Sequence, residues 1–357
     1  MSKPAAEEAD RLYSSLHNIF YPRCVAFIGV STKEDNLLRY NSFNRYLKDK
    51  WGYRVQKIPL DAGFGCPNRL GRSRAGAGCI YCENAAFSPH SRTTEPPSLR
   101  EQIRAGIING TTRYNARGFI AYFQAFTNTY APLNVLKERY DIIREFSEIR
   151  GLAIGTRPDC VDDGILDLIE SYSTTYEVWI EYGLQSAGNQ TLMRINRGHT
   201  VERFLEAIER TATRNILMCV HVILGLPGEG REEILKTARL LSGLPVHGVK
   251  IHHCHVVRDT PLADLYLHGD YHPPDKEAYI AWVCDFLEHL PEKVLVHRLV
   301  GDAPQGLLLA PTWAQNKKQV LDEIHAELER RDTRQGMKVH IGPDVMGEDS
   351  SGIPVIT

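Results

Sequence analysis

The chain has 357 residues, of which 43% are hydrophobic and 24% charged, a globular composition that excludes a disordered, collagen-like or coiled-coil protein. Lys and Arg (42) nearly balance Asp and Glu (44), so a globally basic nucleic-acid binder is excluded while a local basic patch stays open. The absence of an 18-residue apolar run and the polar N-terminus predict a cytoplasmic protein without a membrane partner.

The N-terminal segment contains one apolar run, residues 20–31 (FYPRCVAFIGVS). This run resembles the opening strand of the CoA-binding Rossmann domain of ADP-forming acyl-CoA synthetases. No glycine fingerprint follows Gly29, and no room remains for a second βα unit. We therefore expect residues 1–38 to form a short extension and not a nucleotide site.

The next part of the chain, residues 39–265, alternates short apolar runs with helical patterns. The expected strands are 55–60, 119–125, 152–156, 178–183, 216–225 and 248–257. The expected helices between them are 98–109, 133–149, 162–172, 200–214 and 231–242. This alternation predicts parallel βαβ units, and polar segments follow the strands. We expect an α/β partial barrel with six strands, whose chemistry lies at the carboxyl ends of the strands.

The C-terminal part reads as an extension packed against the barrel, over residues 266–338. It contains a helix, a strand at 294–299 and a charged helix at 315–331. Residues 339–357 read as a weakly ordered tail.

Three of the eight cysteines, Cys66, Cys79 and Cys82, follow the first expected strand in a glycine-rich loop with Cys-x12-Cys-x2-Cys spacing. Three thiolates can hold a four-iron cluster with one iron open, and Tyr81 could pack beside the group that binds that iron. The alternative is a structural zinc site with His90 as fourth ligand. The spacing alone leaves both open. The other cysteines show no cluster spacing.

The position of this loop favours the iron–sulfur cluster over the zinc site, because a three-cysteine loop after strand one of a βα barrel resembles the radical S-adenosylmethionine (SAM) superfamily. The long first gap departs from the common Cys-x3-Cys-x2-Cys and resembles the YhcC/YtqA-like subgroup, relatives of the radical SAM part of Elongator subunit three. The matching segments, across residues 37–335, include GCIYCENAAFSP, FTNTYAP, GTRPDC, EYGLQS, NRGHT, HVILGLPGE, KIHHCHVV and HRLVGDAP. The resemblance implies a radical SAM TIM-type partial (β/α)6 barrel, with a [4Fe–4S] cluster on the three cysteines and SAM on its open iron.

The resemblance also implies which residues contact SAM. Thr127, Asn128 and Thr129, at the end of the second strand, take the place of the segment that binds the methionyl amino group. The alternative is a turn in which Asn128 caps the next helix. Ile223 or Leu224 could pack on the adenine.

Glu181 and Gln185, at the end of the fourth strand, approach the SAM ribose or the substrate in similar proteins. An ion pair from Glu181 to Arg157 or Arg194 is an equally weighted alternative. Glu229, in the same motif as Leu224, could instead cap the helix that follows it.

The further catalytic candidates are an arginine and two histidines. Arg157 can fork onto a carboxylate or a phosphate. His253 and His255 share one face of their strand while His252 takes the other, and two histidines without a carboxylate make a weak metal site. We expect them to contact substrate or to pack in the core.

A basic run interleaved with aromatic residues spans residues 36–75, with nine Arg and Lys against two Asp. Such a run can grip phosphates and stack bases, although a solvated helix face is the usual explanation. The candidate nucleic-acid contacts are Arg39, Arg45, Lys48, Arg69, Arg72 and Arg74.

The resemblance implies that an electron from a flavodoxin or ferredoxin-type donor cleaves SAM to methionine and a 5′-deoxyadenosyl radical, which abstracts a hydrogen atom from the substrate. The substrate implied is wobble uridine of tRNA, remodelled at its 5-substituent. The alternatives are radical SAM chemistry on a small metabolite or peptide, and a non-catalytic, zinc-stabilised RNA-binding protein.

Overall fold

The structure is a computed structural model that describes residues 38–69, 78–83, 96–302 and 306–339, together with the backbone of 347–348 and 354–355. The run at 20–31, His90, Arg72 and Arg74 lie outside the described residues.

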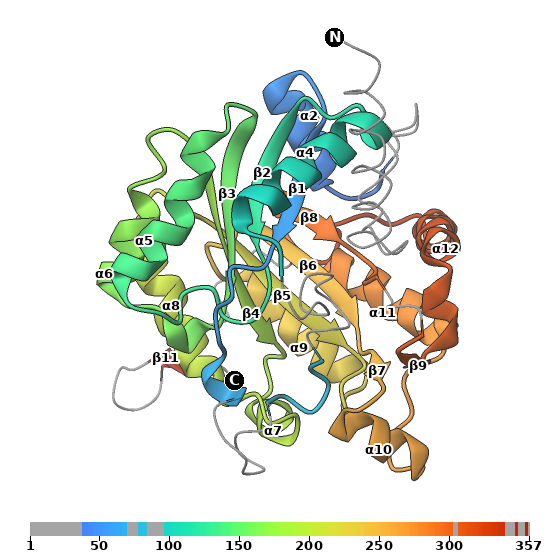
Figure 1. Ribbon diagram of the computed structural model, residues 1–357. Coiled ribbons are helices and arrows are strands. Elements are labelled where there is room, and N and C mark those ends of the chain that lie inside the picture. The colour runs from blue at the N-terminus through green and yellow to red at the C-terminus, as the bar shows by residue number, and fades with distance from the viewer. Residues whose placement is uncertain are drawn as a thin grey trace.

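A seven-stranded parallel sheet in the order β1-β2-β3-β4-β5-β6-β8 forms the centre of the fold. It curls into a half-barrel (Figure 1). The strands are β1 (Val55–Leu60), β2 (Gly118–Phe123), β3 (Ile149–Thr156), β4 (Glu177–Gln185), β5 (Leu217–Leu224), β6 (Gly248–His253) and β8 (Leu295–Arg298). The predicted partial α/β barrel is thus confirmed.

Helices cover the outer face of the half-barrel (Figure 1). They are α4 (Leu99–Tyr114), α5 (Leu133–Asp141), α6 (Asp163–Glu170), α8 (Val201–Ala212), α9 (Arg231–Ser242) and α11 (Lys276–Glu288). Strand residues that point outward, such as Ile180 and Val220, join one large apolar core with these helices. Alternate residues point inward, because successive side chains of a strand take opposite faces.

The amino ends of the strands are closed by α2 (Phe43–Trp51). Phe43 and Leu47, one helical turn apart, pack on the inward-facing Val55, Trp179 and Leu295. The segment before α2 also pairs with the edge strand, since Asn41 O accepts from Val296 N at 2.7 Å. The half-barrel interior therefore has an apolar floor, and its polar residues lie nearer the carboxyl ends of the strands.

The C-terminal region contributes to the sheet as well as packing on it. The strand expected at 294–299 is β8, which pairs in parallel with β6 and makes the sheet one strand wider than the six expected. The expected strand 248–257 divides into β6 and β7 (Val256–Val257), and β7 pairs antiparallel with β9 (Leu308–Ala310). The helix α12 (Lys317–Arg330) packs against α11.

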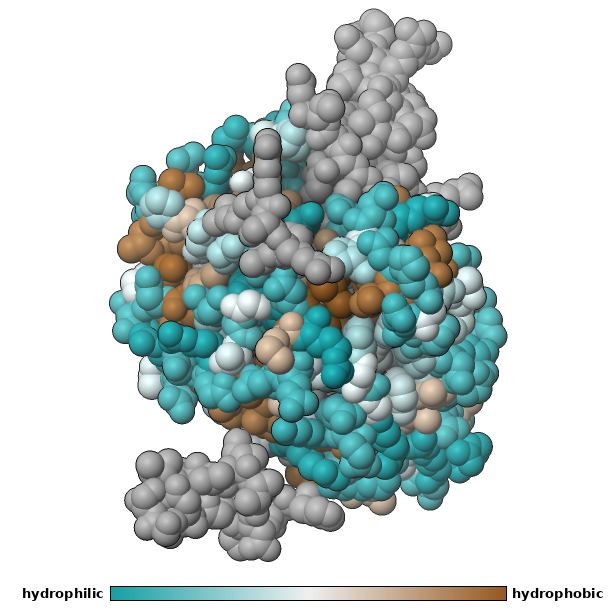
Figure 2. Space-filling model, turned by 90° about the horizontal axis from the view of Figure 1, so that it is seen from below, coloured by the Kyte–Doolittle hydropathy of each residue, from teal (hydrophilic) through white to brown (hydrophobic). Residues whose placement is uncertain are grey.

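The carboxyl ends of the strands face the side on which α7 (Asn189–Arg194) and α10 (Pro261–Leu267) lie (Figure 1). Seen from that side, the surface is mostly hydrophilic, with hydrophobic side chains gathered in patches (Figure 2). Two further short strands, β10 (Gly347–Glu348) and β11 (Pro354–Val355), pair with each other in the tail. Among the described residues, no helix is both long and apolar enough to span a membrane.

Candidate active site

The cysteine loop, residues 66–82, begins six residues after β1, and its two described ends lie against each other. Asn68 Nδ2 donates to Cys79 Sγ at 3.5 Å, and Cys82 N donates to Cys79 O at 3.0 Å. Burial, together with the neighbouring Cys79 and Cys66, raises the pKa of the Cys82 thiol to about 12. The two described ends of the loop are thus held together, since Asn68, two residues after Cys66, contacts the sulfur of Cys79.

Backbone hydrogen bonds anchor this loop to three other segments at the same end of the half-barrel. Gly65 O accepts from Thr127 N after β2, and Ile80 N donates to Ile195 O after α7. Ile80 O accepts from Leu262 N at the start of α10. The described ends of the cysteine loop are thus fixed above the carboxyl ends of the strands, as predicted from its position in the chain.

Arg197 brings a positive charge to the loop. Its Nη1 lies 3.6 Å from Cys79 Sγ, while Nε and Nη2 donate to Gly183 O. The side chain is buried, and although burial lowers the pKa of an arginine, the charges of Tyr81 and Cys79 hold that of Arg197 above its usual value. Arg197 therefore places a buried positive charge beside the sulfur of Cys79.

The segment Thr127–Asn128–Thr129 lies at the rim after β2 and is completely buried. Asn128 Nδ2 donates to Phe123 O at 3.1 Å and to Gly155 O at 2.8 Å, so it does not cap α5, whose first turn follows Pro132. Asn128 Oδ1 is buried without a hydrogen-bond partner among the described residues. A buried amide oxygen without a partner costs about 1–3 kcal/mol, which an incoming N–H donor would recover.

Arg157, in the loop after β3, bonds to its own loop and to the loop after α7. Its Nε and Nη2 fork onto the Asp159 carboxylate at 2.9 and 2.8 Å, and Nη1 donates to Arg197 O at 2.7 Å. The guanidinium thus forks onto a carboxylate of the chain itself, Asp159. Arg157 fixes the loop that carries Arg197.

Four polar side chains form what we call the interior ion cluster: Lys57 on β1, Glu181 on β4, His221 on β5 and Lys250 on β6. Glu181 Oε1 lies 2.5 Å from Lys57 Nζ, Glu181 Oε2 lies 2.8 Å from His221 Nε2, and Lys250 Nζ also bonds Glu181 Oε2. Glu181 therefore pairs with neither Arg157 nor Arg194, and that alternative is wrong. Its partners come from strands far away in the sequence.

The protonation states follow from these contacts. Burial raises the pKa of Glu181, yet the ion pairs with Lys250 and Lys57 hold it well below its usual value. Burial and the charge of Lys250 lower the pKa of His221 to about 4, so a neutral His221 donates its Nε2 proton to Glu181. Burial lowers the pKa of Lys250 to about 8. Two ammonium groups thus share one carboxylate inside the half-barrel.

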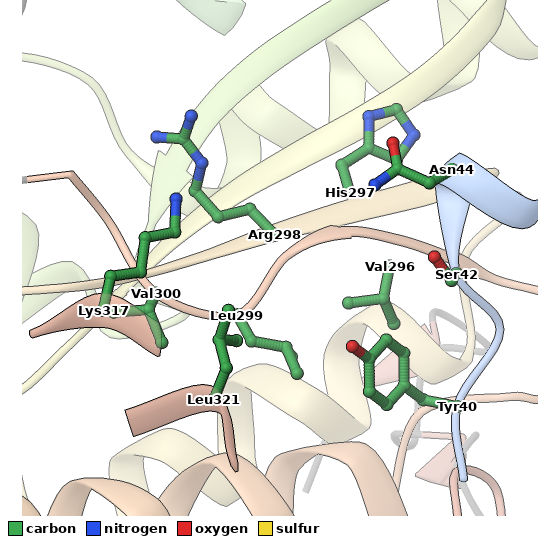
Figure 3. Close-up of a pocket in the computed structure, with 10 residues that line it drawn as sticks. All are labelled: Tyr40, Ser42, Asn44, Val296, His297, Arg298, Leu299, Val300, Lys317 and Leu321. Carbon is green, nitrogen blue, oxygen red and sulfur yellow. The ribbon is translucent and has the colours of Figure 1, made fainter. Parts of the chain in front are cut away.

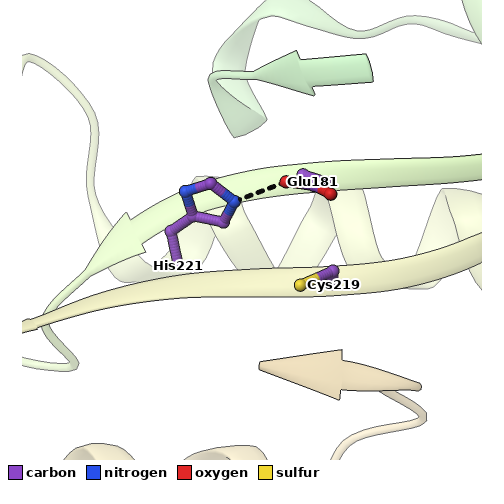
Figure 4. Close-up of side chains that lie close together, drawn as sticks. All are labelled: Glu181, Cys219 and His221. Carbon is purple, nitrogen blue, oxygen red and sulfur yellow. Dashed lines mark hydrogen bonds and ion pairs between the residues drawn. The ribbon is translucent and has the colours of Figure 1, made fainter. Parts of the chain in front are cut away.

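Glu181, Cys219 and His221 place three potential metal ligands within 4.8 Å of one another (Figure 4). Burial raises the pKa of Cys219 far above its usual value, so this thiol stays protonated. The ammonium groups of Lys57 and Lys250 repel a cation at the same carboxylate. We therefore assign no metal to these residues.

The remaining candidates separate by the face on which they lie. Strand alternation points Ile223 inward, whereas Leu224 is buried in the core behind the sheet. Leu224 is therefore not placed to pack on an adenine in the interior.

Gln185 ends β4 with φ 78°, a backbone strain of the kind that clusters at functional sites. Glu229 does not cap α9; it accepts from the Ser186 hydroxyl, and Glu233 caps the helix.

The histidines after β6 also divide. His253 packs between Tyr279 and Trp313 on the outer face, with ring centroids 5.6 and 4.9 Å away, and His255 lies 4.0 Å from it. His252 points inward, where its ring lies 5.5 Å from that of His221. His252 and His221 thus point inward together with His297 of β8, and none of the three was among the candidates.

The basic run does not form one patch in the structure. Arg45 and Lys48 are exposed on α2, at the amino ends of the strands, while Arg69, within the cysteine loop at the opposite ends, pairs with Glu83. Arg39 pairs with Asp332, and Lys57 is inside the half-barrel. Strands of six residues or more separate the two groups by roughly 20 Å.

Comparison with known proteins agrees with this geometry. The radical SAM superfamily model matches residues 63–241, and the radical SAM C-terminal domain model matches residues 246–330. The chain belongs to the radical SAM superfamily. It is 37% identical to YtqA of Bacillus subtilis over 298 residues, covering 84% of this chain and 92% of that protein. It is 38% identical to YhcC of Escherichia coli K12, covering 78% and 88%.

More distant similarities reach two larger proteins. The tRNA uridine(34) acetyltransferase of Dehalococcoides mccartyi is 24% identical over 69% of this chain and 61% of that protein. The solved structure of Methanocaldococcus infernus Elp3, with an N-terminal deletion, is 17% identical with a TM-score of 0.57, over 79% of this chain and 64% of that one. At this identity the structural match shows the fold alone.

Radical SAM proteins bind a [4Fe–4S] cluster and SAM, and the residues of this chain fit both groups. Cys66, Cys79 and Cys82 supply three sulfur ligands, with a guanidinium beside Cys79. His90, the fourth ligand considered for a zinc site, lies outside the described residues. Asn128 Oδ1 offers an unused acceptor at the rim, which fits the amino group of SAM.

The radical SAM interior also contains residues that sequence reasoning missed, above all Lys57, His221 and Lys250. Each lies in an otherwise apolar strand, in VQKIPL, MCVHVIL and GVKIHH. A charged residue in a buried strand requires a partner of opposite charge or a hydrogen-bond partner, and this requirement could have marked the three residues as part of a buried polar site. The sequence could not show that all three share Glu181.

Proposed function

We propose that this protein is a radical SAM enzyme that acts on tRNA and remodels the 5-substituent of wobble uridine. The observation that carries the proposal is that the cysteine loop and the Thr127–Thr129 rim overlie a half-barrel interior lined with hydrogen-bonding groups. A base that enters this interior would meet the interior ion cluster. The relatives named for tRNA uridine(34) support the choice of substrate.

The cluster, when bound, supplies the electron that cleaves SAM and releases a 5′-deoxyadenosyl radical. The residues of the chain itself hold the bound groups in place and exclude water. Arg197 holds its guanidinium against the sulfur of Cys79, Asn128 Oδ1 offers a free hydrogen-bond acceptor, and the apolar floor formed by α2 keeps water from one end of the interior. Lys250 and His221 are placed to orient polar groups of the base.

The chain spans 61% of the D. mccartyi relative, so the proposal covers the radical step and not acetyl transfer. A flavodoxin or ferredoxin-type protein is the reductant that we propose. The alternative substrate, a small metabolite or peptide, would use the same interior.

The test is an anaerobic assay of the reconstituted protein with SAM, dithionite and tRNA from a strain that lacks the gene. We expect 5′-deoxyadenosine together with a mass change in wobble uridine after nuclease digestion. Cys79→Ala abolishes both products, whereas Cys160→Ala, a nearby half-buried cysteine outside the spacing, retains them. Formation of 5′-deoxyadenosine without any change in tRNA nucleosides would reject tRNA as substrate. Bound zinc with no iron would reject the enzyme.

A further inference from the structure

A small cavity lies beside β8, the edge strand of the half-barrel. Its volume is about 80 Å³, where a single water needs roughly 10–15 Å³. Its walls come from the segment before α2, from β8 and the residues after it, and from the start of α12, and they include Tyr40, Asn44, His297, Arg298, Lys317 and Leu321 (Figure 3). The cavity is therefore large enough for a tetrahedral oxyanion.

Two cations meet at one end of this cavity. Arg298 Nη2 lies 3.2 Å from Asp302 Oδ2, and Lys317 Nζ lies 2.7 Å from Asp302 Oδ1. The side chains of Arg298 and Lys317 are only 21% and 15% exposed. Two positive charges thus face one negative charge, and the group keeps a net charge of +1 away from bulk water.

The position of Lys317 adds to this excess. It is the first residue of α12, and Lys318 follows it, with no acidic residue in the first turn. The amino end of a helix carries a partial positive charge, so a lysine there is unfavourable. Burial and the charge of Arg298 lower the pKa of Lys317 to about 8, as expected for an ammonium group that lacks sufficient negative charge.

A purely structural ion pair between β8 and α12 would need one cation for Asp302. The second cation has no counter-charge of its own among the described residues that line the cavity. Arginine and lysine donors converging on one space are the usual recognition elements for phosphate. The excess charge therefore points to an anionic ligand.

The cavity also adjoins the proposed substrate space. His297 lines the cavity, and its Nδ1 lies 3.3 Å from Lys57 Nζ in the interior ion cluster. Arg298 is near enough to Lys250 to lower its pKa. A nucleotide whose base enters the half-barrel interior would therefore have its backbone near this cavity.

We propose that the cavity beside β8 binds a backbone phosphate of the RNA substrate, between Arg298 and Lys317, with Asp302 holding the two cations in place. The RNA origin of the phosphate rests on the proposed function; the anion site itself rests only on the geometry of the cavity.

The first test measures tRNA affinity by fluorescence anisotropy over a range of KCl concentrations. Arg298→Gln and Lys317→Gln each weaken binding about tenfold and lower the slope of log K against log salt by about 0.7–0.9, the value for one phosphate contact. Lys318→Gln is the matched control, because Lys318 is 88% exposed and pairs with Asp322 on the next turn. Asp302→Asn frees the cations and tightens binding, a gain that misfolding would not produce.

The second test uses inorganic phosphate without RNA and follows acetylation of Lys317 by mass spectrometry. Phosphate slows acetylation of Lys317 and leaves Lys318 unchanged. Protection by phosphate without any tRNA binding would reject the proposed function and assign the cavity to a smaller phosphorylated ligand. Tight tRNA binding that is equal in all four variants would overturn the RNA contact while leaving the proposed function intact. Absence of both effects would overturn the site altogether.

Discussion

Lys57 and Glu181 lie 124 positions apart in the sequence, and their Nζ and Oε1 atoms are 2.5 Å apart inside the half-barrel. Lys250 bonds the second oxygen of the same carboxylate from the other side. Each of the three side chains is at most 7% exposed. This asymmetric arrangement, two cations for one anion, predicts unequal effects of removing its members.

Glu181→Gln leaves two buried ammonium groups without a counter-charge and is expected to lower the free energy of unfolding by about 3–5 kcal/mol. Lys250→Met leaves a balanced Lys57–Glu181 pair and costs less than about 2 kcal/mol. Urea unfolding of both variants measures the difference. Equal losses would show that the two lysines do not compete for the carboxylate.

The pKa of Lys250 predicts a dependence of stability on pH. Burial lowers this pKa from its usual 10.5 to about 8, so between these values the folded protein binds fewer protons than the unfolded chain. The free energy of unfolding of the wild type therefore rises with pH across this window. Relative to Lys250→Met, we expect a gain of about 1–3 kcal/mol between pH 7.5 and pH 10. The titration of Lys317 changes the free energy of unfolding of the wild type and of Lys250→Met by the same amount, so it cancels in the comparison. A difference in the free energy of unfolding between the two proteins that does not change with pH would contradict the prediction.

The raised pKa of Glu229 predicts the opposite dependence, a stabilising contribution that decreases as the pH rises. Burial raises the pKa of this half-buried carboxyl to about 7, so the folded protein holds the proton more tightly than the unfolded chain. Its stabilising contribution is complete below about pH 4.5 and is lost as the pH rises through 7. Glu229→Gln keeps an acceptor for Ser186 and should raise the free energy of unfolding by about 1–2 kcal/mol at pH 8.5.

At pH 5, where the wild-type carboxyl is largely protonated, the same substitution should give little gain. Melting temperatures measured from pH 5 to pH 8.5 test this. The control is Glu232→Gln, three residues along on the exposed face of α9, with a side chain 76% exposed. A gain of Glu229→Gln that is the same at every pH would disprove an ionised carboxylate as its cause.

The separation of the basic residues predicts which of them contact RNA. Arg69 lies within the cysteine loop, whereas Arg45 and Lys48 lie at the far ends of the strands. Arg69→Gln should weaken tRNA binding about five- to tenfold, and Arg45→Gln or Lys48→Gln by less than about twofold. Anisotropy at fixed salt compares them. A larger loss from Arg45→Gln would place the RNA on the α2 end instead.

Local patterns in the sequence determined a large part of the fold. The predicted strand 55–60 and helix 231–242 coincide with β1 and α9 in the structure. The three-cysteine loop and the rim segment 127–129 could be placed from their positions after apolar strands. These features are local, because alternation, helical periodicity and spacing are properties of neighbouring residues.

Other features needed the tertiary structure, because they depend on register between distant strands. The strand at 294–299 was expected, but only pairing with β6 makes it part of the sheet. His253 points outward and His252 inward, a choice fixed by which face of β6 meets α11. The ion pairs from Lys57 and Lys250 to Glu181 span 124 and 69 positions, and only the curl of the sheet brings these three side chains to one point. The sequence by itself determined the cysteine loop and the strand order along the chain, whereas the content of the interior was decided by how the strands pair and curl.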